Sequence, residues 1–118
     1  EGFETLAKAL AKLPAASLDA VLTIRNYHDL KDPAPVLAEL KRILKPGGVL
    51  GIADSRTTRG RDLPTHRIAE DVIIREVTAA GFSLAGVSQM LSNPKDDYGK
   101  TFWDARWIVD QSCLKFAR

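Results

Sequence analysis

A strand–helix–strand series with clear boundaries lies in the first half of the chain. The apolar run Leu18–Ile24 is short and bounded by polar residues, which is typical of a parallel strand buried on both faces. Asp32 and Pro33 begin a helical pattern that Pro46-Gly47-Gly48 ends. Residues 49–53 form the next apolar run. Because a crossover helix returns the chain in the same direction, this series predicts an α/β fold with a mostly parallel sheet.

The glycine-rich turn that opens a nucleotide-binding series of this kind is absent. In such folds the glycines let the backbone approach the ligand, and the N–H groups at the start of the following helix face it. No two glycines in the 118 residues stand at positions i and i+2. The chain therefore corresponds to the second half of such a fold, and we expect it to be poorly equipped to hold a cofactor alone.

Composition indicates one globular domain over residues 1–118. With 45% hydrophobic residues, this length supports one core and is short for two domains. The net charge of +2 neither requires nor excludes an anionic partner. The single cysteine, Cys113, excludes an internal disulfide. Cysteine and histidine spacing predicts no metal site. No apolar run approaches the ~20 residues of a membrane span, and no interleaved aromatics indicate a nucleic-acid groove, so neither partner is expected.

Further elements are predicted on both sides of the series. Apolar residues at Phe3, Leu6, Leu10 and Leu13 indicate an amphipathic helix before it. After it the pattern predicts a polar loop at 55–66, a helix at 68–80 closed by Gly81, a strand at 82–91, an irregular segment at 92–106 and a strand at 108–116. No helix separates the last two strands, so they can pair antiparallel.

Several stretches resemble a known family. They are Leu-Asp-Ala-Val at 18–21, residues 37–48 ending in Leu-Lys-Pro-Gly-Gly, Ile-Ala-Asp at 52–54 and residues 76–82. Together they resemble the later motifs of class I S-adenosylmethionine-dependent methyltransferases. More narrowly, residues 25–30, 65–68, 93–97 and 110–116 resemble a little-characterised bacterial subfamily of predicted methyltransferases.

The resemblance implies a partial Rossmann-like methyltransferase sheet with flanking helices. The chain would supply the family's fourth to seventh strands, with the penultimate strand at the edge and the last strand inserted antiparallel. The first three strands, with the glycine loop and the acidic residue that holds the cofactor ribose, would be missing. S-adenosylmethionine is therefore the cofactor that the resemblance implies, and binding by this chain alone is not expected.

The loop after the first strand is the candidate catalytic site, because ligands in open α/β sheets bind beyond the carboxyl ends of the strands. The resemblance places this loop beside the methyl donor. It implies that Asn26 and Tyr27 bind the cofactor, with Tyr27 on the sulfonium face and Asn26 also able to reach a substrate. His28 could act as a general base. Alternatively, Asn26 and Asp29 form turn hydrogen bonds, Tyr27 packs on the helix and His28 is solvated.

Asp54 ends the next strand and could orient His28, or it could bond only nearby backbone. The residues predicted to bind substrate are Arg25, Arg56, His66 and Arg67. Guanidinium groups suit carboxylates or phosphates, so an acidic substrate is conceivable. The alternative for the basic residues after Asp54 is a solvated, mobile loop.

Two further groups have alternative interpretations. Trp103, with Phe102 and Trp107, could close a substrate pocket or simply anchor a loop. Asp96-Asp97 has no third ligand at metal spacing and is interpreted as a turn.

Two functions remain open. The chain could be the substrate-side half of a methyltransferase that acts on a small molecule. It could instead be a non-catalytic unit that forms a homodimer, or pairs with another chain, through an exposed Leu18–Ile24 edge. The bacterial cytoplasm is the favoured compartment, with the periplasm as the alternative.

Overall fold

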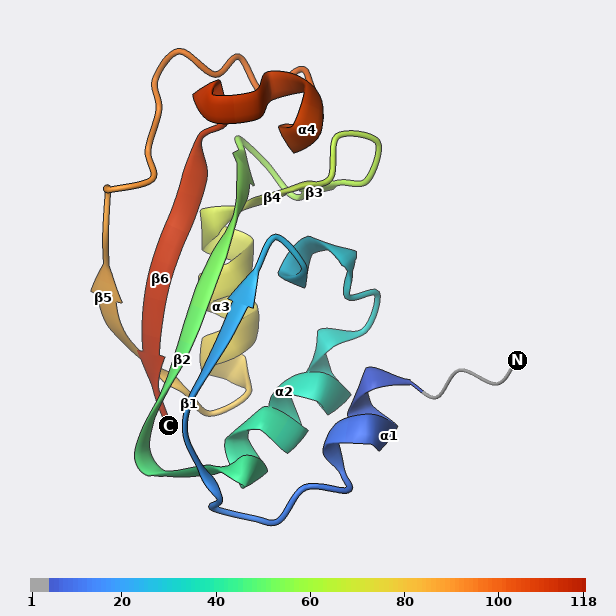
Figure 1. Ribbon diagram of the computed structural model, residues 1–118, viewed down its shortest axis with the longest axis vertical. Coiled ribbons are helices and arrows are strands. Elements are labelled where there is room, and N and C mark those ends of the chain that lie inside the picture. Colours follow the sequence, from blue (N-terminus) through green and yellow to red (C-terminus); the bar gives the residue numbers. More distant parts are fainter. Residues whose placement is uncertain (1–4) are drawn as a thin grey trace.

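A mixed β-sheet with helices on one face makes up the computed structural model (Figure 1), which describes residues 5–118 apart from the side chains of Phe102 and Trp107. The main strands are β1 (Leu18–Ile24), β2 (Leu44–Thr57), β5 (Ser83–Val87) and β6 (Gln111–Ala117). β1 and β2 are parallel, whereas β6 lies between β2 and β5 and is antiparallel to both. The predicted α/β class and the inserted antiparallel last strand are confirmed.

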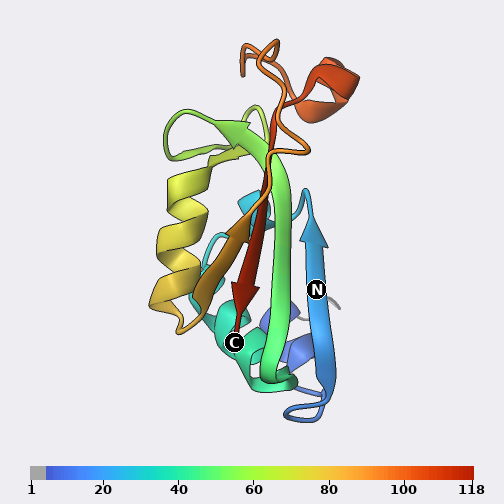
Figure 2. The same ribbon diagram turned by 90° about the vertical axis from the view of Figure 1, so that its left-hand side faces the viewer.

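Two helices, α2 (Pro33–Ile43) and α3 (Glu70–Ala79), lie on one side of the sheet (Figure 2). The core combines their apolar faces with inward residues of the strands: Val36, Leu37, Leu40, Ile43, Val72, Ile73, Val77, Leu50, Ile52, Leu114 and Phe116. Each fully buried Leu or Ile stabilises the fold by about 1.5–3 kcal/mol. Gly81 follows α3 with φ of +100°, as its predicted C-terminal position requires. Asp32 precedes α2 as predicted, but its side chain makes no capping hydrogen bond.

The first helix is shorter than predicted. α1 (Leu6–Leu10) begins after Thr5, whose hydroxyl accepts a hydrogen bond from the Lys8 N–H at 3.2 Å. Phe3, which was predicted to extend its apolar stripe, lies outside the described residues. None of the helices that the structure describes has the length and apolar character needed to cross a membrane.

β1 is covered on one face only, so the prediction of burial on both faces is wrong. Val21 and Thr23 are partly buried on the helix side, whereas Leu22 and Ile24 are 68% and 52% exposed. Within residues 5–118, β1 pairs with β2 alone. An apolar cleft of about 220 Å³ between α1, α2 and β1 adjoins this strand. The predicted exposed edge is therefore present in the described part of the chain.

The predicted polar loop contains regular structure. β2 continues to Thr57, and the short strands β3 (Arg61–Asp62) and β4 (Arg67–Ala69) form an antiparallel hairpin. β4 also pairs in parallel with the end of β2. Two- and three-residue strands show no sequence periodicity, which explains why they were missed.

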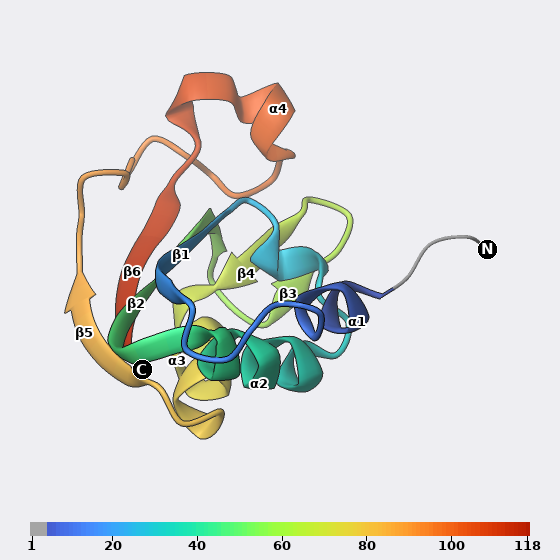
Figure 3. The ribbon, with the colours of Figure 1, turned by 60° about the horizontal axis from the view of Figure 1, so that its bottom comes forward.

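The end of the sheet where β1 and β2 finish is covered by later segments. The hairpin lies there together with α4 (Phe102–Ala105) and the 3₁₀ turn Arg106–Ile108 (Figures 1 and 3). The loop after β1, with its own 3₁₀ turn Tyr27–Asp29, lies at the same end. Residues distant in the sequence thus meet beyond the carboxyl ends of the parallel strands.

We expect the isolated chain to self-associate through β1, because its backbone edge is open and no charged side chain interrupts Leu22 and Ile24. Replacing both residues with lysine should restore a monomer, whereas Leu63→Lys, at a residue 64% exposed in the hairpin, should not. Sedimentation velocity over a range of protein concentrations checks this. A monodisperse monomer of the unaltered chain at high micromolar concentration would contradict it, as would rapid amide exchange throughout β1.

Candidate functional site

The loop after β1 and the end of β2 meet at a buried histidine–aspartate pair. Asp54 Oδ1 lies 2.8 Å from His28 Nδ1, and Asp54 Oδ2 accepts a hydrogen bond from the His28 backbone N–H at 2.8 Å. Asp54 Oδ1 also accepts from the Ser55 N–H at 2.8 Å. His28 and Asp54 are 2% and 0% exposed. Asp54 therefore holds both the ring and the backbone of His28, and a solvated His28 is not what the structure shows.

Opposing effects act on the pKa of His28. Burial lowers it, but the hydrogen bond and charge of Asp54, with the charge of Asp29, outweigh this effect and raise the pKa above its ordinary value. With Asp54 Oδ1 as the acceptor on the Nδ1 side, the neutral ring carries its proton on Nδ1 and its lone pair on Nε2. Nε2 is buried and forms no hydrogen bond with the described residues.

Tyr27 lies in the core, as the packing alternative supposed. It is 2% exposed, and its hydroxyl donates a hydrogen bond to Glu76 Oε1 on α3 at 2.9 Å. Arg61 donates to the same carboxylate at 2.6 and 2.8 Å. Burial and the neighbouring Glu76 hold the pKa of Tyr27 well above its usual range. The cofactor-binding role of Tyr27 stays a prediction, and it would have to involve a ring already packed in the core.

Asn26 and Arg25 lie at the surface. Asn26 is exposed and lines the apolar cleft beside β1. Arg25 has a left-handed backbone, with φ of +57°, and its Nε donates to Gln111 Oε1 at 3.2 Å. Of the two predicted cofactor ligands, Asn26 therefore has an accessible side chain, whereas Tyr27 is buried.

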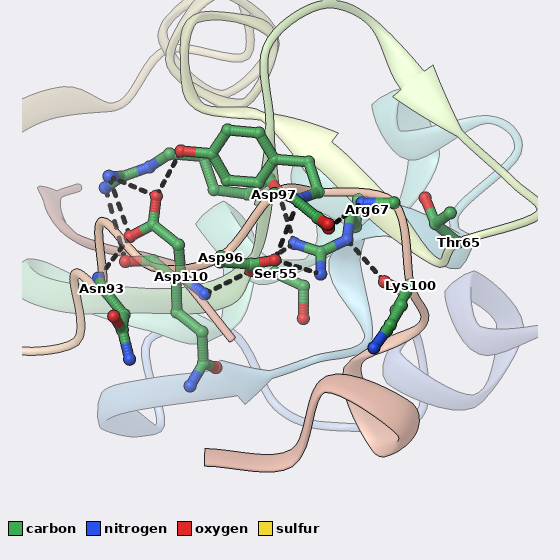
Figure 4. A network of polar contacts seen from close by, with 12 residues as sticks. Ser55, Thr65, Arg67, Asn93, Asp96, Asp97, Lys100 and Asp110 are labelled. Atoms are coloured by element: carbon green, nitrogen blue, oxygen red, sulfur yellow. Dashed lines mark hydrogen bonds and ion pairs between the residues drawn. The ribbon is translucent and has the colours of Figure 1, made fainter. Parts of the chain in front are cut away.

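Arg67 is wholly buried and paired with Asp96 (Figure 4). Arg67 Nη1 and Nη2 lie 2.8 and 3.0 Å from the two carboxylate oxygens of Asp96. Its Nε donates to the Lys100 carbonyl at 2.9 Å and Nη1 to the Arg56 carbonyl at 2.8 Å. Arg67 therefore has no exposed donor that could bind a substrate, and the structure does not support the prediction of substrate binding by this residue. The alternative of a solvated loop does not hold for Arg67 either, because its side chain is buried. We interpret Arg67 as a residue that holds the site together.

Asp96 and Asp110 extend this network (Figure 4). Asp96 accepts hydrogen bonds from the backbone N–H groups of Tyr98 at 2.9 Å and Asp110 at 2.6 Å. Burial raises the pKa of Asp96, but Arg67 and these backbone donors hold it below its usual range. Asp110 accepts from the Tyr98 hydroxyl at 2.7 Å and from the Asn93 N–H at 2.8 Å. The turn predicted at Asp96-Asp97 is thus an anchor, which sequence reasoning missed.

Arg56 also forms ion pairs with carboxylates. Its Nη2 lies 2.9 Å from Glu70 Oε1, and its Nη1 lies 3.3 Å from Asp110 Oδ2. Arg56 therefore ties β2 to α3 and to the segment before β6. Its predicted role in substrate binding stays a prediction, for a guanidinium that is 19% exposed.

His66, predicted to bind substrate, comes close to His28. The two ring centroids are 5.4 Å apart with the rings nearly perpendicular, and the half-exposed Trp103 ring lies 4.8 Å from His66. Asp29 Oδ1 lies 3.3 Å from His28 Nε2 and 3.7 Å from His66 Nδ1. Trp103 is thus placed beside the site, while the side chains of Phe102 and Trp107 lie outside the described ones.

Comparisons with known proteins agree with this architecture. Residues 3–52 match a family described as a methyltransferase domain. The fold is similar to that of the cyclase SpnF, with a TM-score of 0.65 and 18% identity over 91% of this chain and 52% of that one. It is also similar to a SAM-dependent methyltransferase from Aquifex aeolicus, with a TM-score of 0.59 and 23% identity over 90% of this chain and 48% of that one. A search of curated proteins found no match.

A third similar structure contains ligands. The 1,6-didemethyltoxoflavin-N1-methyltransferase of Burkholderia thailandensis, with 1,6-didemethyltoxoflavin and S-adenosylhomocysteine bound, has a TM-score of 0.64 and 15% identity over 92% of this chain and 48% of that one. The chain spans about half the length of these three structures. The matches confirm the predicted resemblance to methyltransferases by sequence over residues 3–52, and the fold is similar to that of an S-adenosylmethionine-dependent methyltransferase over most of the chain.

We expect Asp96→Asn to lower the free energy of unfolding by about 3 kcal/mol at neutral pH, because it leaves the buried Arg67 charge uncompensated. The neighbouring exposed Asp97→Asn is the matched control and should change little. Because folding lowers the pKa of Asp96, its contribution is complete above its unfolded pKa and is lost as the pH falls through the folded value. Urea unfolding at neutral and acidic pH should therefore show the difference between Asp96→Asn and the unaltered chain narrowing in acid. Equal stabilities at neutral pH would contradict the assignment.

Proposed function

We propose that the chain is the acceptor-side half of a class I S-adenosylmethionine-dependent methyltransferase that acts on a small molecule. The observation that supports this most is the position of the His28–Asp54 pair. It lies just after Ile24 and Ala53, the last paired residues of β1 and β2, at the carboxyl-end side of this parallel pair, which is the side where ligands bind in open α/β sheets. The methyltransferase-domain match over residues 3–52 includes the strand and loop that carry His28.

In this proposal His28 acts on the acceptor. Asp54 holds the ring with Nδ1 turned toward β2, so Nε2 is the atom left for chemistry. A cleft of about 280 Å³ adjoins His28, with Asp29, Lys31 and Leu63 among its lining residues. His28 either accepts a proton from the acceptor as a general base or orients it by a hydrogen bond.

The described residues fit only one side of the cofactor. Asn26 is exposed and lines the cleft beside β1, where it could contact the cofactor. Residues 5–118 contain no glycine-rich turn after a strand that would hold the nucleoside of the cofactor. When bound, S-adenosylmethionine supplies the methyl group. The rest of its site would have to come from residues that pack against β1.

The alternative function is a folded, non-catalytic unit that associates through β1 with a second copy of itself. The specific observation in its favour is the open edge of β1 with Leu22 and Ile24 exposed. The similarity to a cyclase is relevant as well, because one fold can support different reactions and fold alone does not assign an activity.

We expect the isolated chain to bind S-adenosylmethionine no better than millimolar, because the backbone groups that hold the nucleoside in such folds are not among its described residues. Isothermal titration calorimetry with the cofactor measures this directly. A micromolar dissociation constant would reveal a complete cofactor site within this chain and would contradict the half-site proposal.

Catalysis is tested after joining the chain to the N-terminal half of a related methyltransferase. At saturating cofactor, His28→Ala should lower kcat at least tenfold, since general acid–base groups contribute about 100- to 10,000-fold. Asn26→Ala should mainly raise the KM for the acceptor, because at saturating cofactor the loss that remains is that of a hydrogen bond from Asn26 to the acceptor. The exposed Arg59→Ala is the control and should leave both constants unchanged. Unchanged turnover in His28→Ala would remove His28 from the mechanism.

A further inference from the structure

We propose that His28, Asp29 and His66 form a binding site for a divalent first-row metal ion of the Zn²⁺ type. The ligand atoms are His28 Nε2, one Asp29 carboxylate oxygen and His66 Nδ1, which all lie within 4.8 Å of one another. The site joins the loop after β1 to the turn between β3 and β4. It goes beyond the proposed function, because metal binding does not depend on methyl transfer.

The distances suit shared coordination of one ion. Two ligand atoms at about 2.1 Å from Zn²⁺ are about 3.4 Å apart at the tetrahedral angle. Asp29 Oδ1 lies 3.3 Å from His28 Nε2 and 3.7 Å from His66 Nδ1. The two histidine nitrogens lie within 4.8 Å of each other, so a movement of at most about 1.4 Å brings them to the same separation. His66 is partly exposed, at 37% of its side chain, and can make this movement.

His28 Nε2 provides an independent reason to expect a ligand here. The atom is buried, and it forms no hydrogen bond with the described residues. Its closest acidic neighbour is the Asp29 carboxylate oxygen at 3.3 Å. A ring with its proton on Nδ1 offers the Nε2 lone pair to a metal ion that the Asp29 carboxylate also reaches.

Asp54 completes an arrangement typical of metal-binding histidines. Such a histidine usually donates its other ring N–H to a carboxylate, which fixes the tautomer and strengthens the ligand. The 2.8 Å contact between His28 Nδ1 and Asp54 Oδ1 has this geometry. Asp54 is fully buried and binds no metal itself in this arrangement.

The ligand types select the class of ion. Two imidazoles and one carboxylate suit Zn²⁺ and its first-row neighbours, whereas Ca²⁺ and Mg²⁺ prefer oxygen ligands. Catalytic zinc sites keep three protein ligands and one open position. Here that position is available to water or to an acceptor oxygen, because Asp29 is exposed and borders the 280 Å³ cleft. With metal bound, Nε2 is coordinated, so His28 orients the acceptor through the ion and does not accept its proton.

The test uses the full chain, purified without an affinity tag and titrated with Zn²⁺ and with Co²⁺. We expect one equivalent to bind, with the intense absorption of four-coordinate Co²⁺. Asp29→Ala and His66→Ala change exposed or partly exposed side chains and should each weaken binding tenfold or more. Asp32→Ala, in the same loop and without a capping hydrogen bond, is the matched control and should bind as the unaltered chain does. Circular dichroism verifies that each variant is folded.

Two outcomes overturn the inference: no saturable binding of either ion, or equal weakening in the three variants, which would indicate only surface carboxylates. A chain that binds no metal but depends on His28 for methyl transfer in the joined enzyme would retain the proposed function and lose the metal site. A chain that binds the metal but shows no His28-dependent methyl transfer in the joined enzyme would retain the metal site and lose the proposed function.

Discussion

The buried pair of Arg67 and Asp96 is the interaction on which the candidate site depends. A charged guanidinium at 0% exposure is strongly unfavourable unless its donors are satisfied, and here Asp96 and two backbone carbonyls accept from it. Arg67 directly follows His66, whose backbone has a left-handed φ of +58°. Fixing Arg67 therefore fixes the direction in which His66 leaves the hairpin. Asp96 in turn anchors the segment that carries Trp103 beside His66.

The same end of the sheet contains two carboxylates with different surroundings. Asp96 faces a permanent cation and backbone donors, which hold its pKa low. Asp54 faces His28. Burial lowers the pKa of His28, but the hydrogen bond and charge of Asp54, with the charge of Asp29, raise it above its ordinary value. Asp96 thus pairs with Arg67, which cannot lose its proton near neutral pH, whereas Asp54 pairs with the His28 ring, which can. This difference separates the structural network around Arg67 from the candidate reactive pair of His28 and Asp54.

Much of the fold could be predicted from the sequence, because α2, α3 and β1 have clear boundaries and periodicity. The strand predicted at residues 49–53 exists, but β2 runs from Leu44 to Thr57, well beyond the apolar run on both sides. The antiparallel insertion of β6 followed from the family resemblance. The Arg67–Asp96 pair joins residues 29 positions apart through an irregular segment, so no local pattern could indicate it. Burial of β1 on both faces was wrong because apolar composition shows what a strand can bury, not whether a covering layer lies over Leu22 and Ile24. The nearness of His28 and His66 depends on the short hairpin, which the pattern also missed.

The two proposed functions share one feature of the structure, the open edge of β1. This strand ends at Ile24, and the loop that follows places Asn26 at the surface and His28 in the interior. A strand that paired in parallel with β1 would end beside Asn26, and the turn after it would lie at the same end of the sheet as His28. Pairing at this edge would therefore cover Leu22 and Ile24 and bring further residues to the site together. Association and catalysis need not exclude each other, because the same edge would serve both.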